Sequence, residues 1–205
     1  GNQPRIAHWN LACFAQALLP LLGESEEAAI AAAQAAIDAY PARFEAARAA
    51  GMAAKIGLAD AREGDLDLAH ALLDLMAESR VDFTNLFRRL CDAAADPAAD
   101  EAVRSLFADP AAFDGWAARW RARLAEESRA PAEIAAAMRA TNPAVIPRNH
   151  LVEEAIAAVV DRDDLAPFET LLAVLAKPFD DRPADDRFVQ PPRPEEVVAA
   201  TFCGT

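Results

Sequence analysis

Apolar side chains recur three or four residues apart through most of the first 178 positions, and polar residues fill the intervals. This spacing is that of one face of an α-helix, so the pattern predicts a succession of helices. The clearest apolar stripe consists of Phe113, Trp116, Trp120 and Leu124. Aromatic side chains at helical spacing are typical of core packing, and we predict that this stripe is buried.

The first helix is predicted to begin near Pro4, because proline is favoured in the first helical turn, and to end near Gly23. Its apolar stripe is made of Leu11, Phe14, Leu18 and Leu22. Trp9 and Cys13 lie on an adjoining face, so more than half of the circumference is apolar. A helix of this kind is expected to be deeply buried.

Acids and prolines indicate where other helices begin and end. Asp82 and Asp109 are predicted N-caps, and Pro110 follows the second of them at the first helical position. Pro41 is predicted to break or restart the helix that follows Ser25, because its ring removes a hydrogen-bond donor and clashes with the preceding turn.

The densest turn signal lies in the stretch 138–156, directly before a new apolar-periodic segment. Its polar and turn-forming residues are Asn142, Pro143, Pro147, Arg148 and Asn149. We interpret the stretch as a corner between two groups of helices. Asn142 and Pro143 are expected to form the turn, and Arg148 and Asn149 to fix the next helix by capping it or by pairing with a core of the protein that lies outside this sequence.

From Phe179 onward, repeated prolines exclude regular helix and favour an extended path along the surface. We therefore predict an all-α fold with a single multi-helix domain over residues 1–178, containing about eight to ten helices. Residues 179–205 are predicted to form a proline-rich tail that ends in Phe-Cys-Gly-Thr.

Composition supports helix and restricts the class of partner. Much of the 54% hydrophobic content is alanine, and only 7 glycines are present. The net charge of −13 disfavours binding to a phosphate backbone, so no nucleic-acid partner is expected. No apolar run is long enough to span a bilayer, so no membrane partner is expected. Because the sequence starts at Gly1, we expect it to be part of a longer chain, whose targeting signals cannot be read here.

Catalytic motifs are not evident in the sequence. It contains no glycine-rich phosphate loop and no metalloprotease or hydrolase signature. His8, His70 and His150 are far apart and are interpreted as helix or surface residues. Consecutive acids such as those at 153–154 and 161–164 are interpreted as solvated faces and caps, because neighbouring residues on a helix do not point at one cation. No metal site is predicted.

The three cysteines have different surroundings in the sequence. Cys13 and Cys91 lie in apolar helical patterns and are predicted to be buried. Their wide separation excludes a disulfide framework and favours a reducing, cytoplasmic compartment. Cys203 follows the proline-rich tail and precedes Gly204, so an exposed thiol there is a candidate for oxidation or disulfide exchange.

Several blocks of residues together resemble the SelO family, also called YdiU, whose members are protein adenylyltransferases with a kinase-like (pseudokinase) fold. The blocks are Asn2-Gln3-Pro4 with Trp9-Asn10-Leu11, Asp82-Phe83-Thr84 with Phe87-Arg88-Arg89-Leu90, Asn142-Pro143 with Arg148-Asn149, Leu171 to Pro178, and Cys203-Gly204-Thr205. They occur in the family's order and cover essentially the whole chain.

The resemblance implies a bacterial parent enzyme that transfers AMP from ATP, with Mg²⁺, to Ser, Thr or Tyr hydroxyls of other proteins. The family's catalytic and metal-binding residues precede the Asn2-Gln3-Pro4 signature, so no catalytic residue and no ATP or Mg²⁺ ligand is expected in this chain. Its expected partners are the kinase-like core of the same protein and the protein substrates. The family also implies that Cys203 is a redox-active regulatory residue that pairs with a cysteine of the core.

A second hypothesis remains open beside the enzyme interpretation. The helical region is, in this alternative, a non-catalytic interaction or regulatory module that orients protein partners. The sequence that precedes Gly1 would distinguish the two, because only the enzyme hypothesis requires a kinase-like segment there.

Overall fold

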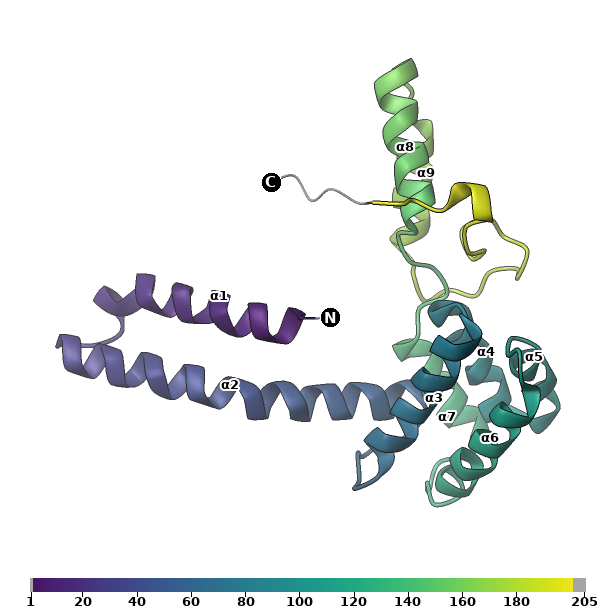
Figure 1. Cartoon of the computed structure of the whole chain (residues 1–205), viewed down its shortest axis with the longest axis horizontal. Coiled ribbons are helices and arrows are strands. Elements are labelled where there is room, and N and C mark those ends of the chain that lie inside the picture. Colours follow the sequence, from purple (N-terminus) through teal and green to yellow (C-terminus); the bar gives the residue numbers. More distant parts are fainter. Residues whose placement is uncertain (1, 201–205) are drawn as a thin grey trace. The chain divides into compact units, whose positions relative to one another are not determined.

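The computed structural model describes residues 2–200. In this range the chain forms helices and turns without strands, so the all-α prediction is confirmed. The nine α-helices of the described residues are α1 (Gln3–Leu18), α2 (Glu26–Lys55), α3 (Asp65–Ser79), α4 (Phe83–Ala95), α5 (Asp100–Arg104), α6 (Pro110–Leu124), α7 (Pro131–Thr141), α8 (Asn149–Arg162) and α9 (Ala166–Leu175) (Figure 1). Short 3-10 helices occur at Leu19–Leu21, Pro97–Ala99 and Pro194–Glu196. No helix in the described range is long and apolar enough to cross a membrane.

The chain divides into two compact units, Gly1–Met52 and Ala53–Thr205. Helix α2 begins in the first unit and ends in the second. The predicted division between residues 1–178 and the tail at 179–205 is a different boundary, and it stays a prediction.

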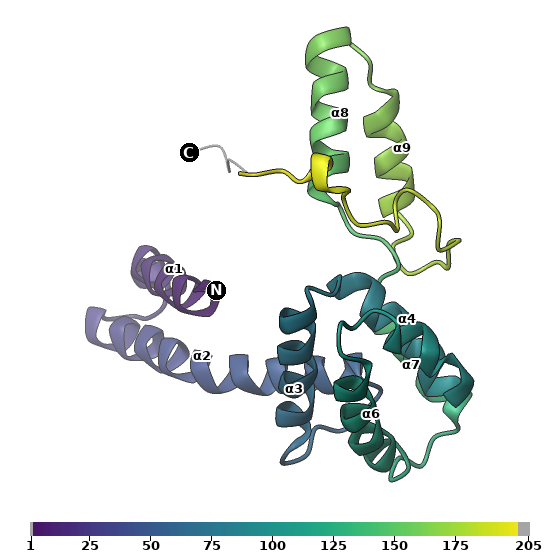
Figure 2. The same ribbon diagram turned by 45° about the vertical axis from the view of Figure 1, so that its right-hand side comes forward.

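In the first unit, α1 runs beside the first half of α2 (Figures 1 and 2). The ring of His8 stacks on Tyr40 with 5.2 Å between centroids, and the Tyr40 hydroxyl donates a hydrogen bond to the Pro4 carbonyl. The prediction that α1 is deeply buried is wrong, since Trp9 and Phe14 are 66% and 61% exposed. One neighbouring helix covers only one side of α1, and the short alanine side chains that dominate α2 reach little of the remaining apolar surface.

Two further expectations about the first unit are also wrong. Cys13 is exposed, for the same reason as the rest of its helix. Pro41 lies inside α2, which continues through it as one helix of 30 residues. A proline ring removes one backbone hydrogen bond, but the alanine-rich segments on both sides favour helix strongly enough to keep it continuous.

The core of the second unit is formed where α4 packs against α7 and α3 packs against α6. The predicted burial of the aromatic stripe of α6 is confirmed. The Trp116 indole donates a 2.8 Å hydrogen bond to the Leu68 carbonyl, and the Trp120 indole donates a 2.8 Å bond to the Ile56 carbonyl. Buried indole N–H groups require such acceptors, and here the acceptors connect α6 to α3 and to the turn that follows α2.

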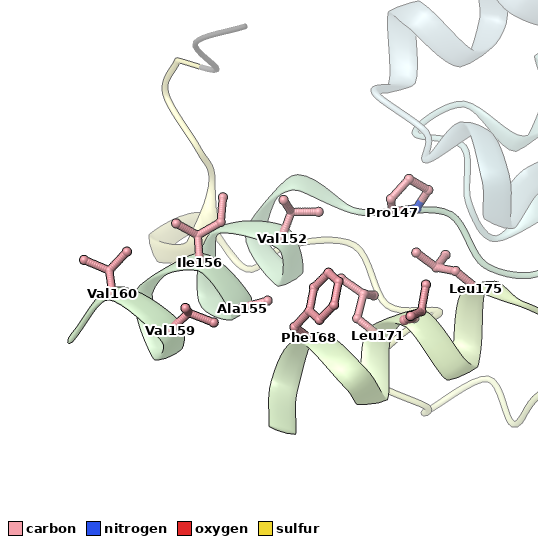
Figure 3. Close-up of a pocket in the computed structure, with 10 residues that line it drawn as sticks. Pro147, Val152, Ala155, Ile156, Val159, Val160, Phe168, Leu171 and Leu175 are labelled. Carbon is pink, nitrogen blue, oxygen red and sulfur yellow. The ribbon is translucent and has the colours of Figure 1, made fainter. Parts of the chain in front are cut away.

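Helices α8 and α9 lie side by side in both views (Figures 1 and 2) and enclose an apolar groove of about 440 Å³ (Figure 3). Val152 and Ala155 of α8 and Phe168 of α9 line it. Leu171 is buried between the helices, whereas Phe168 and Leu172 are half exposed. The α8–α9 pair therefore keeps one apolar surface uncovered by the described residues.

Two glycines with the same left-handed backbone allow a test of how tightly the second unit is packed. Gly57 and Gly64 both have φ of +87°, but a Cβ at Gly57 would lie 2.7 Å from Ile134 and 2.9 Å from Met138, whereas the space at Gly64 is open. Gly64→Ala should cost about 1–2 kcal/mol of unfolding free energy from backbone strain alone. Gly57→Ala should cost about 2–5 kcal/mol, because overpacking adds to the same strain. Urea unfolding checks both values, and equal losses would show that the close contact is unimportant.

Candidate functional site

The side chain of Asn142, directly after α7, is completely buried and joins two distant segments. Its amide nitrogen donates a 2.9 Å hydrogen bond to the carbonyl of Lys55, the last residue of α2. Its amide oxygen accepts a 2.9 Å hydrogen bond from the Lys55 ammonium. Asn142 thereby satisfies a carbonyl at the end of α2 that the helix itself leaves without a partner.

The Lys55 ammonium also lies over two aromatic rings of α4. It is 4.7 Å from the ring centroid of Phe87 and 5.1 Å from that of Phe83. Cation–π attraction compensates part of the cost of removing the charge from water. Burial nevertheless lowers the pKa of Lys55, and the neighbouring Cys91 opposes this shift only in part.

Cys91 lies on the same face of α4 and is buried, as predicted. Its thiol donates to the Phe87 carbonyl, and the Asn142 amide nitrogen is 3.8 Å from its sulfur. Burial raises the pKa of the Cys91 thiol, and the hydrogen bond from Asn142 offsets this only partly. A thiol held in its protonated form is a poor nucleophile, so Cys91 contributes packing and a weak hydrogen bond.

A second contact between α4 and the corner at 142–148 is an ion pair. The Arg148 guanidinium donates to both carboxylate oxygens of Asp82, at 2.9 and 3.1 Å, and the arginine side chain is only 5% exposed. Asp82 also caps α4 as predicted, because its carboxylate accepts a 2.9 Å hydrogen bond from the backbone N–H of Asn85. Burial by itself raises the pKa of Asp82, but the hydrogen bonds from Arg148 and Asn85 outweigh burial, and the pKa is lowered.

Arg88 supplies a third contact, from the middle of α4. One of its nitrogens donates to the carbonyls of Arg139 and Asn142, at 3.1 and 2.9 Å. These carbonyls belong to the end of α7, where no further helical turn provides donors. The blocks 82–90 and 142–149, far apart in the sequence, are therefore in direct contact.

Two other residues of the corner, Pro143 and Asn149, take no part in the hydrogen bonds and ion pairs described above. Asn149 is the exposed first residue of α8, and Arg148 precedes that helix without capping it through its side chain. Pro143 follows Asn142 in the turn after α7. The residues Asn2, Gln3, Pro4 and Trp9 belong to the start of the first unit, and Cys203 lies outside the described residues.

Sequence reasoning missed Lys55. Its signal was a single charged residue among the apolar positions of Met-Ala-Ala-Lys-Ile-Gly-Leu, which places a cation where the pattern requires burial. The described residues contain no group of three or more His, Cys, Asp or Glu side chains that could hold a metal ion. The arrangement of Lys55, Cys91, Asn142 and the Asp82–Arg148 pair is suited to holding helix ends together, because these side chains bond to one another and to backbone carbonyls.

Comparison with known proteins identifies a family over most of the chain. Residues 1–176 match the family model described as "Protein adenylyltransferase SelO". Curated relatives named protein nucleotidyltransferase YdiU are 54% identical in a Bradyrhizobium species, 54% in Methylorubrum extorquens and 50% in Alkalilimnicola ehrlichii. Each match covers 100% of this chain but only 41–42% of the relative. The chain thus spans about two fifths of the length of these relatives.

The network predicts an unequal response at two asparagines of the same block. Asn142→Ala should lower the unfolding free energy by about 2–3 kcal/mol, because it removes a fully buried side chain and leaves the half-buried Lys55 ammonium and carbonyl without their partner. The matched control is Asn149→Ala at the exposed start of α8, which should change stability by less than about 0.5 kcal/mol. Chemical denaturation measures both, and equal effects would mean that Asn142 does not hold the end of α2.

The Asp82–Arg148 pair predicts a pH dependence. The pKa of Asp82 is lowered in the folded state from its ordinary value of 3.8, so its stabilisation is present above that pH. It is lost as pH falls through the folded-state pKa, where the carboxylate becomes protonated. Asp82→Asn retains a capping side chain but not the charge, so its stability deficit should be full at pH 6 and shrink below the ordinary pKa of 3.8. Unfolding curves at several pH values test this, and a deficit that does not vary with pH would contradict it.

Proposed function

Since the chain belongs to the SelO family of protein adenylyltransferases, we propose that it is the C-terminal helical region of an enzyme that transfers AMP from ATP to Ser, Thr or Tyr hydroxyls of proteins. The family match over residues 1–176 carries this proposal. In the proposal, the parent enzyme is a bacterial, cytoplasmic nucleotidyltransferase with a kinase-like core.

The proposed division of labour places ATP and Mg²⁺ outside this chain. About three fifths of the Bradyrhizobium relative lies beyond the matched region, which leaves ample length for a separate nucleotide site. The most distinctive polar residues of this chain, Arg88, Asn142 and Arg148, use their donors on carbonyls and carboxylates of the chain itself. Because these donors are used within the chain, we expect the region to have a structural role and to be catalytically inactive by itself.

The alternative function is a helical interaction module that orients protein partners. Each unit offers an observation that favours it: Trp9 and Phe14 of α1 are exposed in the first unit, and the groove between α8 and α9 is apolar in the second. An apolar groove such as that between α8 and α9 is typical of contacts with other protein segments. The two hypotheses differ in whether the parent carries any AMP-transfer activity.

Cys203 is proposed as the redox-regulatory residue of this region. Support comes from its sequence position in the terminal Cys-Gly-Thr, which matches the family resemblance. Of the other two cysteines, Cys91 is buried with a raised thiol pKa, and Cys13 is exposed.

Labelling with ATP that carries radioactive phosphorus at the α position tests the enzyme hypothesis. The full-length parent with Mg²⁺ should label protein acceptors, and addition of a chelator should abolish the labelling because the developing phosphate charge is no longer neutralised. The 205-residue chain alone should give no labelling under the same conditions. A parent that labels no acceptor would favour the module hypothesis, and labelling by the isolated chain would place active residues inside it.

A further inference from the structure

The groove between α8 and α9 is lined only by apolar side chains. All ten residues that line it are Pro, Ala, Val, Ile, Leu or Phe. Val160 is 76% exposed and Ile156 51% on the α8 side (Figure 3), and Leu172 is 58% exposed on the α9 side. A single exposed apolar side chain is ordinary on a protein surface, but a groove built from several of them indicates a contact site.

The lining restricts the backbone conformation of whatever fills the groove. Among the described residues, it offers no side-chain hydrogen-bond donor or acceptor. The backbone groups along its walls belong to α8 and α9 and are bonded within those helices. An extended peptide would bury its own N–H and C=O groups there without partners, whereas a helix satisfies them internally. The groove therefore fits a helix with one apolar face.

The length of α9 sets the length of this contact. Helix α9 has 10 residues, which is about 15 Å at a rise of 1.5 Å per residue. The groove residues Phe168 and Leu175 lie near its two ends. A helix lying along the groove would contact it over about three turns, with apolar residues recurring at intervals of three and four.

Each rim of the groove carries an exposed glutamate. Glu153 is three positions before Ile156 on α8, and Glu169 is three positions before Leu172 on α9. Residues three apart are neighbours on a helix surface, so each acid lies beside an exposed groove residue. Glu154, on another face of α8, is already paired with Arg187. A helix with lysine or arginine beside its apolar stripe would match these rims.

The same features disfavour two other occupants. A symmetric dimer would bring two copies of one surface together, and Glu153 and Glu169 would then face like charges. The net charge of −13 on the chain adds to this repulsion. A fatty acid would also fit poorly, because no Lys or Arg lines the described groove to bind its carboxylate.

The small size of the contact favours a segment of the same polypeptide. A three-turn helix buries less surface than the roughly 1,200–2,000 Å² typical of specific interfaces between separate proteins. A segment of the same chain is present at an effective concentration on the order of 1 mM, so that even a weak contact is mostly formed. The match to the Bradyrhizobium relative covers only 41% of that protein, which leaves ample length for such a segment.

We propose that an amphipathic helix from the rest of the parent protein docks in the α8–α9 groove. Its apolar face contacts Ile156, Val160 and Leu172. Its basic residues lie opposite Glu153 and Glu169. This inference rests on that part of the proposed function which makes the chain one region of a longer protein, and it adds the surface that holds the region and the chemistry of the segment that binds there.

Thiol labelling of the full-length parent tests whether the groove is covered. Val160→Cys places a thiol on the groove, and Asp161→Cys places one about 100° around α8 at an exposed position. A maleimide is added, and mass spectrometry of the peptides separates these positions from the native cysteines. An effective concentration of about 1 mM and a Kd of about 100 µM predict labelling roughly tenfold slower at position 160 than at 161.

A neutral substitution on the opposite wall tests the apolar contact. Leu172→Gln, added to Val160→Cys, should remove most of the tenfold protection, because burial of one leucine is worth about a tenfold change in an equilibrium constant or more. The matched control is Ala173→Gln, the next residue of α9, which is exposed and does not line the groove. It should leave the labelling rate at position 160 unchanged.

A charge reversal tests the rims. Glu153→Lys, added to Val160→Cys, should speed labelling about two- to fivefold, because it replaces an attraction to the basic helix by repulsion. Asp161→Lys makes the same change of charge nearer to the new thiol but on another side of α8, so it measures the direct influence of charge on the thiol. Its effect should be smaller than that of Glu153→Lys.

Each outcome supports or overturns a stated part of the inference. Equal labelling at positions 160 and 161 would show an open groove and overturn it. Protection that falls on dilution would assign the groove to a second copy, and protection that requires an added acceptor protein would assign it to a substrate. Either result would overturn the assignment to the parent. Equal effects of Glu153→Lys and Asp161→Lys would overturn the basic flanks.

The AMP-labelling assay reports separately on the enzyme hypothesis. A parent that protects position 160 but transfers no AMP would reject that hypothesis and support the docked helix. A parent that transfers AMP but leaves position 160 unprotected would do the reverse.

Discussion

The buried amide of Asn142 is the contact on which the second unit depends most. Its nitrogen and oxygen both bond to Lys55, so the end of α2 and the end of α7 are fixed to each other. The Asn142 side chain has no exposed surface, so its amide depends on Lys55 for these hydrogen bonds. The Lys55 ammonium that bonds to Asn142 also lies 4.7 Å from the ring centroid of Phe87.

From that corner, arginines hold segments that have no regular secondary structure. A proline-rich tail lacks many backbone donors, but its carbonyls still need partners. Arg88 and Arg148 supply donors to the carbonyls of Phe179 and Val189. The guanidinium groups thus provide the hydrogen-bond donors that backbone N–H groups provide within a helix or sheet. Lysine could not take this role, because its single ammonium cannot present a planar set of donors to a carboxylate and a carbonyl at once.

Sequence patterns predicted what depends on near neighbours. The aromatic stripe of α6 and the caps at Asp82 and Asp109 are local features, and the structure confirms them. The burial of α1 could not be predicted, because it depends on what covers the helix and not on the helix itself. The contact of Lys55 with Asn142 spans 87 positions, and that of Arg148 with Asp82 spans 66, so no local pattern contains them. The sequence pattern nevertheless placed the blocks 82–90 and 142–149 at helix ends, where unpaired backbone groups need side-chain partners.

The residues on which the family resemblance was based have structural roles in the second unit. Asp82, Arg88, Asn142 and Arg148 make contacts that few other residue types could reproduce, since each uses a specific set of donors and acceptors. A distinctive motif is therefore no evidence of catalysis unless its polar groups are free to meet a substrate. Here they are engaged with the chain itself. Family membership and the location of the active site are therefore separate questions. These residues indicate the first strongly and the second only indirectly.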